Sequence, residues 1–326
     1  MKETDVSIAA RALPNTQDER QPLSVAVLVP CYNEELTIVD VVNQFRAALP
    51  HAKIYVYDNN SSDTTYKLAQ SLGVEVRKEA RQGKGHVVRR MFADIDADIY
   101  ILVDGDATYD ASSAPLLIDH LVTNRLDFVN AARVPSSKAA YRPAHELGNR
   151  LLTGAVRAVF GRDFSDMLSG YKVFSRRYVA SFPAMSRGFE IETEFTIHAL
   201  ELQMPCGELS TVYKERPEGS TSKLRTVRDG FRISTFILKL LKDERPLLFF
   251  GGLGVLAIIV AAVLGVSVLA EFFETGLVPR LPTAILSAAL INFGSLLIVT
   301  GFILDLITKA RQEVKRLAYI SVRPPA

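Results

Sequence analysis

Two aspartates separated by one glycine, Asp104 and Asp106, stand at the end of a short apolar run in the segment IYILVDGDATYD. Carboxylate oxygens suit Mg²⁺ and Mn²⁺, which proteins usually hold with one or two carboxylates together with phosphates of the substrate. The glycine lets a ligand approach the backbone closely. Asp-Gly is also a common turn dipeptide, so it is the position after a strand-like run that favours a metal site.

Two further segments carry residues suited to a nucleotide. In YDNNSSDTT, residues 57–65, Asp58 closes an apolar run and could accept hydrogen bonds from a base or a ribose, while part of the run could simply cap the next helix. In RQGKGHVV, residues 81–88, Lys84 stands between two glycines before a helical stretch, where backbone N–H groups and the helix dipole favour a phosphate. The sequence contains neither a Walker A loop nor a GxGxxG motif.

The elements that must position these segments alternate between strand-like and helix-like patterns. Short apolar runs occupy residues 24–30, 53–58 and 99–104, with a weaker run at 127–131. Helical stretches are expected at residues 35–49, 63–72, 84–95 and 114–123. Buried strands that alternate with helices predict βαβ units and a mostly parallel sheet, an α/β fold. Because ligands bind outside the carboxyl ends of such strands, Asp58, Asp104 and Asp106 are expected at one edge of the sheet.

Two uncharged apolar segments follow near the C-terminus, at residues 247–270 and 281–304. Each would be about 36 Å long as a helix, which is enough to cross a bilayer. Lysines and arginines are frequent before the first segment and after the second, whereas the connecting loop holds two glutamates and one arginine. The positive-inside rule therefore predicts a multi-pass protein of the cell's inner (plasma) membrane, with both termini and the catalytic domain in the cytoplasm.

The resulting domain organisation has a catalytic domain before a membrane part. Its predicted segments are a flexible tail at 1–22, the catalytic domain at 23–225, an amphipathic interfacial helix at 226–246, transmembrane helices at 247–270 and 281–304, an external loop at 271–280 and a cytoplasmic tail at 305–326. The alternative for residues 226–246 is a helix that packs on the catalytic domain.

Composition excludes several other classes of protein. The chain has 326 residues, of which 38 are lysine or arginine and 36 are aspartate or glutamate, so its net charge of +2 does not suit a general nucleic-acid binder. The two cysteines cannot form a disulfide framework and suit a reducing compartment. The five histidines have no zinc-site spacing.

The motifs VLVPCYNEE, YDNNSSDTT, GKG, DGD and SGYKVFSRR occur together in an order and spacing that resemble the family-two inverting glycosyltransferases with the GT-A fold. The resemblance covers residues 24–225 and is greatest to the polyprenyl-phosphate hexose synthases, which include dolichyl-phosphate mannose synthase and bacterial enzymes with two C-terminal membrane helices. It implies a nucleotide-binding role for Pro30, Tyr32, Glu34, Asp58 and Asp104, beside the Lys84 argued above.

The same resemblance implies further roles in the site. The divalent ion, Mg²⁺ or Mn²⁺, would lie on Asp104 and Asp106, and downstream basic residues would bind the phosphates of donor and acceptor; by position these are Arg133, Arg216 and Lys223. The mannose synthases have a glutamine ligand two residues after the second aspartate, where this chain has Thr108. Water would then complete the metal shell, and the metal preference stays open.

The resemblance implies that the chain moves a hexose from a nucleotide sugar to polyprenyl phosphate; a UDP-sugar is favoured, and GDP-mannose is also compatible. The cation at Asp106 would offset charge on the departing diphosphate. A phosphate acceptor is already anionic and needs positioning more than a base. A hydroxyl acceptor would need a base, for which the sequence offers Asp166 and Glu190, with Glu192 and Glu194 beside it.

Two other functions remain open at this point. One is a membrane glycosyltransferase that acts on a lipid hydroxyl; processive members of the broader family carry a QxxRW motif, and this chain has no tryptophan. The other is a non-catalytic, membrane-anchored protein that binds nucleotide sugars. Glycines in the first span, among them Gly254 and Gly265, suit close helix packing, and related bacterial enzymes suggest a homo-oligomer such as a tetramer.

Overall fold

The computed structural model describes residues 23–135, 153–154, 156–157, 160–161, 164–188, 190–216 and 238–324. The predicted tail at 1–22, Lys223 and the first half of the predicted interfacial helix lie outside these residues.

A seven-stranded sheet forms the centre of the N-terminal part, in the order β3-β2-β1-β4-β6-β5-β7. The strands are β1 (Val25–Cys31), β2 (Lys53–Asp58), β3 (Glu75–Lys78), β4 (Ile99–Leu102), β5 (Phe128–Pro135), β6 (Lys172–Ser175) and β7 (Cys206–Tyr213). All pairings are parallel except those of β6, which runs antiparallel to both β4 and β5. The prediction of an α/β fold with a mostly parallel sheet is confirmed.

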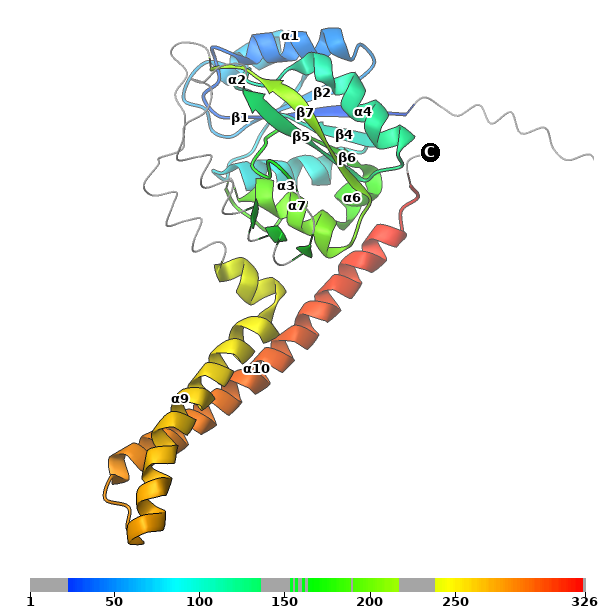
Figure 1. Ribbon diagram of the computed structural model, residues 1–326. Helices are drawn as coiled ribbons and strands as arrows, with labels where there is room; N and C mark the ends of the chain where they lie inside the picture. The colour runs from blue at the N-terminus through cyan, green and yellow to red at the C-terminus, as the bar shows by residue number, and fades with distance from the viewer. Residues whose placement is uncertain are drawn as a thin grey trace, which may run out of the picture.

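Helices cover both faces of this sheet (Figure 1). On one face lie α1 (Ile38–Ala48), α2 (Thr65–Ser71) and α4 (Ala114–Thr123); on the other lie α3 (Lys84–Asp94), α6 (Arg176–Ser181) and α7 (Ile191–Glu201). Alternate residues of β1 therefore enter different cores: Leu28 packs with the second group of helices and Val27 with the first. Burial on both faces explains why the strand is a continuous apolar run.

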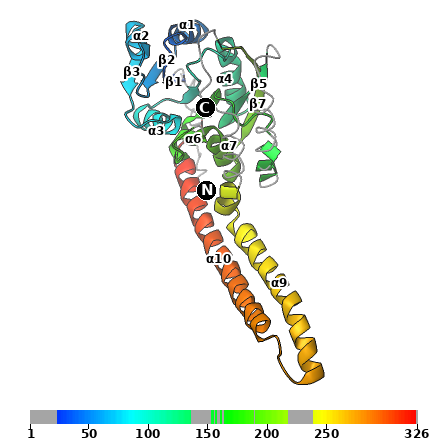
Figure 2. The same cartoon turned by 90° about the vertical axis from the view of Figure 1, so that its left-hand side faces the viewer.

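Two long helices, α9 (Pro246–Thr275) and α10 (Leu281–Ile320), form a hairpin that projects from the sheet domain (Figure 2). Both are long and apolar enough to cross a membrane by length and composition. Apart from Pro246 and Tyr319, the buried residues of the hairpin recur every seventh position, as Gly254, Ala261 and Val268 on α9 and as Ser287, Gly294, Gly301 and Thr308 on α10. A seven-residue repeat is typical of two helices packed along a common seam.

Glycines allow α9 and α10 to approach each other very closely along this seam. A Cβ atom on Gly254 would lie 2.6 Å from the carbonyl oxygen of Gly294, and a Cβ on Gly265 would lie 2.9 Å from Ser287 Oγ. Gly254 and Gly265, which were expected to suit close helix packing, thus pack α9 against α10 of the same chain. The homo-oligomer stays a prediction.

The last turns of α10 extend beyond the predicted span and contact α6 of the sheet domain. The Tyr319 hydroxyl donates to Asp127 Oδ2 at 2.7 Å, and this fully buried carboxylate also accepts hydrogen bonds from the Arg177 guanidinium and the Ser175 hydroxyl. Leu240, from the predicted interfacial helix, is buried in the same core cluster as Tyr319. The hairpin is therefore fixed to the sheet domain by buried contacts.

We expect Tyr319→Phe to lower the free energy of unfolding by about 1–2 kcal/mol, because a buried carboxylate loses one donor while the ring packing is kept. Thermal unfolding of both proteins in the same detergent measures the effect. Tyr66→Phe is the matched control, since the Tyr66 hydroxyl meets only the exposed Gln70 amide among the contacts observed, and it should change stability by less than about 0.5 kcal/mol. Equal losses in the two variants would contradict a specific role for the Tyr319–Asp127 contact.

Candidate active site

The carboxyl ends of β1, β2 and β4 meet at one edge of the sheet, and each is followed by a residue with unusual backbone geometry. Asn33, Asn60 and Ala107 have φ values of +52°, +61° and +58°, in a region that residues other than glycine adopt at a cost. The loops are tied together: Asn33 N donates to Ser61 Oγ at 2.9 Å, and Ser62 N donates to Asn33 Oδ1 at 2.8 Å. Strained loops held in this way are typical of binding sites.

Asp58 lies at this edge, at the end of β2, and is 2% exposed. Its Oδ2 accepts a hydrogen bond of 3.3 Å from Ser61 N, whereas its Oδ1 has no hydrogen-bond partner among the described residues. A buried acceptor without a partner is costly unless a ligand donates to it. The arrangement suits an N–H or O–H group of a nucleoside.

The other residues expected to bind the nucleotide lie on or just after β1. Pro30 is half-buried within the strand, in register with Tyr57 of β2. Tyr32 follows with its ring partly exposed, and Glu34 is buried, with its backbone N–H bonded to Thr65 Oγ1 at 2.8 Å. The structure thus brings Pro30, Tyr32 and Glu34 to the same edge as Asp58.

The DGD loop follows β4. Asp106 Oδ1 accepts a hydrogen bond of 2.6 Å from the Thr108 hydroxyl, and Asp106 Oδ2 lies 2.5 Å from a guanidinium nitrogen of Arg216. Burial alone would lower the pKa of Arg216, but the charge of Asp106 raises it above its ordinary value. Thr108 is fully buried, and its hydroxyl orients Asp106, which is expected to bind the metal, instead of facing solvent.

The SGYK segment lies directly on this loop. A Cβ on Gly170 would lie 2.1 Å from Asp104 Oδ2, so only glycine permits that approach. A Cβ on Gly105 would lie 2.8 Å from Cys31 Sγ, which packs beneath the loop. Cys31 is buried and serves as a small packing residue here.

Lys84, the first residue of α3, reaches the DGD loop. Its ammonium group forms ion pairs with Asp104 and with Glu192 of α7, and these charges hold the pKa of Lys84 above its ordinary value although burial opposes this. The backbone of the glycine-rich loop is fixed at both sides: Gly83 N donates to Asn59 Oδ1 at 2.7 Å, and Gly85 N donates to the carbonyl of Arg187 at 3.2 Å. Lys84 is therefore placed beside the carboxylates by a rigid loop.

The three glutamates of GFEIETEF have different surroundings. Glu190 is exposed at the N-terminus of α7. Glu194 accepts hydrogen bonds of 2.8 Å from the backbone N–H groups of both Met185 and Ser186, so it holds a loop. Glu192 is buried and contacts Lys84. The structure thus brings Glu192 to the DGD loop, and not the Glu190 that the sequence analysis placed in the catalytic set.

Asp166 and Arg133 form a two-pronged ion pair. Arg133 Nε and Nη2 lie 2.6 and 2.8 Å from the two carboxylate oxygens of Asp166. Burial alone would raise the pKa of Asp166, but its hydrogen bonds and charge interaction with Arg133 lower it. A carboxylate held in this way is a weak base, so Asp166 serves to position Arg133, whose guanidinium lies over the Tyr213 ring at 5.3 Å.

Asp104 and Asp106 also fit the expected divalent ion. The described residues contain no group of three or more His, Cys, Asp or Glu side chains suited to a metal. Two carboxylates on one loop match a Mg²⁺ or Mn²⁺ ion that takes its other ligands from a diphosphate and water. Lys84 and Arg216, which face these carboxylates, add positive charge where phosphates would bind.

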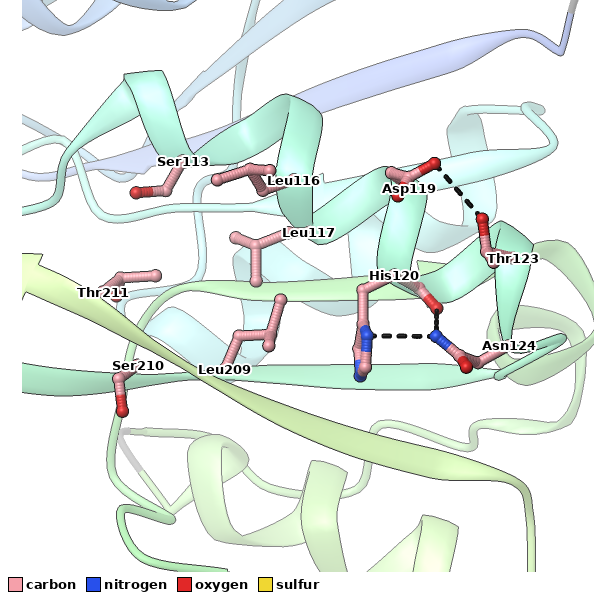
Figure 3. Close-up of a pocket in the computed structure, with 10 residues that line it drawn as sticks. All are labelled: Ser113, Leu116, Leu117, Asp119, His120, Thr123, Asn124, Leu209, Ser210 and Thr211. Carbon is pink, nitrogen blue, oxygen red and sulfur yellow. Dashed lines mark hydrogen bonds between the residues drawn. The ribbon is translucent and has the colours of Figure 1, made fainter.

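A surface pocket of about 320 Å³ lies elsewhere, between α4 and the edge strand β7 (Figure 3). His120 and Asn124 of this region are hydrogen-bonded to each other. None of the residues expected to act in catalysis or binding lines this pocket, so it is separate from the site at the strand ends.

Comparisons with known proteins match this chain to glycosyltransferases. Residues 26–181 match the family described as Glycosyl transferase family 2. The chain is 33% identical over 299 residues to Glycosyltransferase AglJ of Haloferax volcanii, and the alignment covers 91% of this chain and 98% of that protein. It is 24% identical over 186 residues to Dolichol-phosphate mannosyltransferase of Pyrococcus furiosus, covering 54% of this chain and 53% of that protein.

A solved structure shares the fold. Glucosyl-3-phosphoglycerate synthase from Mycobacterium tuberculosis, in complex with Mn²⁺, uridine-diphosphate and phosphoglyceric acid, superposes with a TM-score of 0.56 and 23% sequence identity, covering 68% of this chain and 78% of that one. The same enzyme has been solved with Mg²⁺ and uridine-diphosphate. At this level of identity the likeness concerns the fold.

Proposed function

Because the chain belongs to glycosyl transferase family 2 and has the GT-A fold, we propose that it transfers a hexose from a nucleotide sugar to the phosphate of a polyprenyl phosphate. The observation that carries this proposal is the DGD loop, whose two carboxylates face Lys84 and Arg216, in a domain fixed to two long apolar helices. The relative from Pyrococcus furiosus, a dolichol-phosphate mannosyltransferase by its name, supports a lipid phosphate as acceptor.

The donor binds at the strand ends. Asp58 Oδ1 accepts a hydrogen bond from the nucleoside, and Lys84 and Arg216 donate to the diphosphate. A divalent ion on Asp104 and Asp106 would offset the charge that develops on the departing diphosphate. The solved structures from Mycobacterium tuberculosis that contain UDP with Mn²⁺ or Mg²⁺ support a UDP-sugar as the first candidate.

The acceptor reacts without a strong base. An oxygen of the lipid phosphate attacks the anomeric carbon on the face opposite the diphosphate; the new C–O bond forms as the bond to the diphosphate breaks, and the configuration inverts. The attacking oxygen is already anionic at neutral pH, so no proton has to leave it. The cations that we assign to the acceptor phosphate are Arg133, which Asp166 holds in place, and Lys223, and their task is to position it.

One observation favours the alternative of a hydroxyl acceptor. Burial raises the pKa of Glu192, although Lys84 and Lys172 oppose the shift, and a carboxylate with a raised pKa beside the donor site could accept a proton from an alcohol. Such a role would require Glu192 to leave its ion pair with Lys84.

A donor panel tests the proposal. The purified protein is incubated with radiolabelled UDP-glucose, UDP-N-acetylhexosamine or GDP-mannose, with Mg²⁺ or Mn²⁺, and with or without polyprenyl phosphate. Label from one donor should enter the extracted lipid only when polyprenyl phosphate is present. Label that never leaves any nucleotide sugar, in a folded protein, would favour the non-catalytic alternative.

We further propose that both chain ends and the catalytic domain lie in the cytoplasm and that the turn between α9 and α10 lies outside. A cysteine introduced by Glu274→Cys, at the exposed end of α9, should react with an impermeant thiol reagent in whole cells. A cysteine introduced by Glu313→Cys, on the exposed surface of α10, should react only after permeabilisation. The unsubstituted chain gives the background from Cys206, and labelling of Glu313→Cys alone in whole cells would reverse the orientation.

A further inference from the structure

Lys172 is a lysine with no exposed surface in the middle of the sheet. It begins β6, the strand that lies between the DGD strand β4 and the Arg133 strand β5. Its ammonium group donates to Asn130 Oδ1 at 2.6 Å and to the carbonyl of Met167 at 3.3 Å. Burial lowers the pKa of Lys172 to about 8, against the opposing charges of Glu192 and Asp166, so the group still carries its charge at neutral pH.

The charge of Lys172 faces Glu192. The distance from Lys172 Nζ to Glu192 Oε2 is 3.9 Å, and Glu192 Oε1 forms the ion pair with Lys84 described above. Neither oxygen of Glu192 has a hydrogen-bond donor from a neutral group or the backbone among the described residues. A buried carboxylate with so few partners is held by its counter-charges, and these are the two lysines.

The lysines and acids therefore alternate in one line, from Lys172 through Glu192 and Lys84 to Asp104. Lys84 has a long, flexible side chain, and its place beside Asp104 depends on what holds its ammonium group. When a cation and a diphosphate bind at the DGD loop, Asp104 would contact the cation as well as Lys84. Glu192 is then the protein carboxylate that continues to hold Lys84.

We propose that Lys172 is a positioning residue of the donor site, whose ammonium group holds Glu192 in place so that Glu192 holds Lys84 against the diphosphate of the donor. This inference rests on the proposed function, because it assumes that a nucleoside diphosphate binds at the DGD loop. It assigns a role to the lysine of SGYKVFSRR, a motif that the transfer chemistry itself does not use.

A purely structural role predicts something different. Lys172 also stabilises Asn130, whose amide donates to the backbone carbonyl of Asp166 and to Glu208 Oε1. If this were its whole function, loss of the ammonium group would lower thermal stability but leave the affinity of the folded protein for nucleotide unchanged.

Calorimetric titration with UDP and with GDP, each with Mn²⁺ and without any acceptor, separates the two roles. Lys172→Met and Glu192→Gln should each weaken binding of the nucleotide that the unsubstituted protein prefers by about 10-fold, the loss typical of one charge-assisted contact. The double variant should bind no more weakly than Glu192→Gln, because both changes release the same lysine. Lys172→Arg should recover most of the affinity.

Asp127→Asn is the control, since it removes a buried charge at the contact with α10 and should lower stability without changing the nucleotide affinity. If Lys172→Met does not fold, Lys172→Gln, which removes the charge but keeps a hydrogen-bond donor for Asn130, is measured in its place: a loss of about 10-fold supports the inference, and unchanged affinity overturns it. Unchanged affinity in folded Lys172→Met also overturns it while the proposed function stands. An unsubstituted protein that binds neither nucleotide overturns both.

Discussion

Asp106→Asn is expected to reduce hexose transfer by about 100- to 1,000-fold, the cost of removing one group that stabilises charge in a transition state. The carboxylate carries the charge that a divalent ion needs, and the amide that replaces it has the same shape but no charge. Transfer rates measured over a series of Mn²⁺ concentrations test this result. Excess Mn²⁺ should restore little of the activity.

Asparagine is the right replacement because Asp106 is buried and engaged on both oxygens. The amide oxygen can still accept the hydrogen bond from Thr108, so the loop should keep its conformation. Asp110→Asn is the matched control: Asp110 lies four residues further on and pairs with Lys214 at 3.3 Å, and its loss should change transfer by less than about threefold. Full activity of Asp106→Asn, or of the unsubstituted protein in excess EDTA, would remove the metal from the mechanism.

The strand ends that form the site were predictable because their signal is local. The runs that end in Asp58 and Asp104 are mostly apolar, and apart from Lys53 and Tyr55 the structure buries their strand residues between the two layers of helices. The expected helix at 114–123 coincides with α4, and that at 84–95 differs from α3 by one residue. Parallel pairing of β1 with β2 and β4 then brings the carboxylates to one edge.

The strands that the sequence analysis did not predict depend on long-range pairing. β3 is short and carries three charged residues, Glu75, Arg77 and Lys78. β6 is antiparallel between two strands that precede it in the chain, and no local pattern encodes that position. The position of β6 in the sheet buries Lys172 next to Glu192. In the sequence, the one indication of this buried charge was a lysine within a strand-like segment.

The choice among the acids of the site also required the structure. Helical spacing places Glu190 and Glu194 on one face but does not say which face meets the sheet. In the structure α7 turns Glu192 towards Lys84, and Asp166 is paired with Arg133 rather than left to act as a base. Partners that come from other elements therefore decided which carboxylates could do chemistry.

The acceptor's charge distinguishes transfer to a phosphate from transfer to a hydroxyl. A substitution of Lys223, which we assign to the acceptor phosphate, should reveal it, and a substitution of Arg216, which we assign to the donor diphosphate, is the comparison. Removing one charge-assisted contact to a phosphate costs about 1.5–3 kcal/mol, so Arg216→Ala and Lys223→Ala should each slow transfer to polyprenyl phosphate by about 10- to 100-fold. Rates are measured with saturating donor and with the lipid in mixed micelles.

Donor hydrolysis without lipid separates the two cations. Arg216 lies 2.5 Å from Asp106, so Arg216→Ala should slow hydrolysis of the nucleotide sugar as well as transfer. Lys223, which lies outside the described residues, is expected to serve the acceptor, and Lys223→Ala should leave hydrolysis nearly unchanged. Lys223→Arg, which keeps the charge, is the control and should retain most of the transfer. Equal losses of hydrolysis in both alanine variants would place Lys223 at the donor instead.

The product itself gives the last test of the phosphate acceptor. A hexose joined to a lipid phosphate is a glycosyl phosphate ester, whose sugar is released by mild acid because phosphate is a good leaving group, whereas a simple glycoside of a lipid alcohol survives the same treatment. We therefore expect the labelled lipid to lose its sugar in mild acid, and polyprenol or diacylglycerol to be glycosylated at a small fraction of the rate seen with polyprenyl phosphate. Comparable rates with an alcohol, together with an acid-stable product, would instead make Glu192 the base of a hydroxyl-directed transferase, and Glu192→Gln should then abolish transfer while leaving binding of the lipid unchanged.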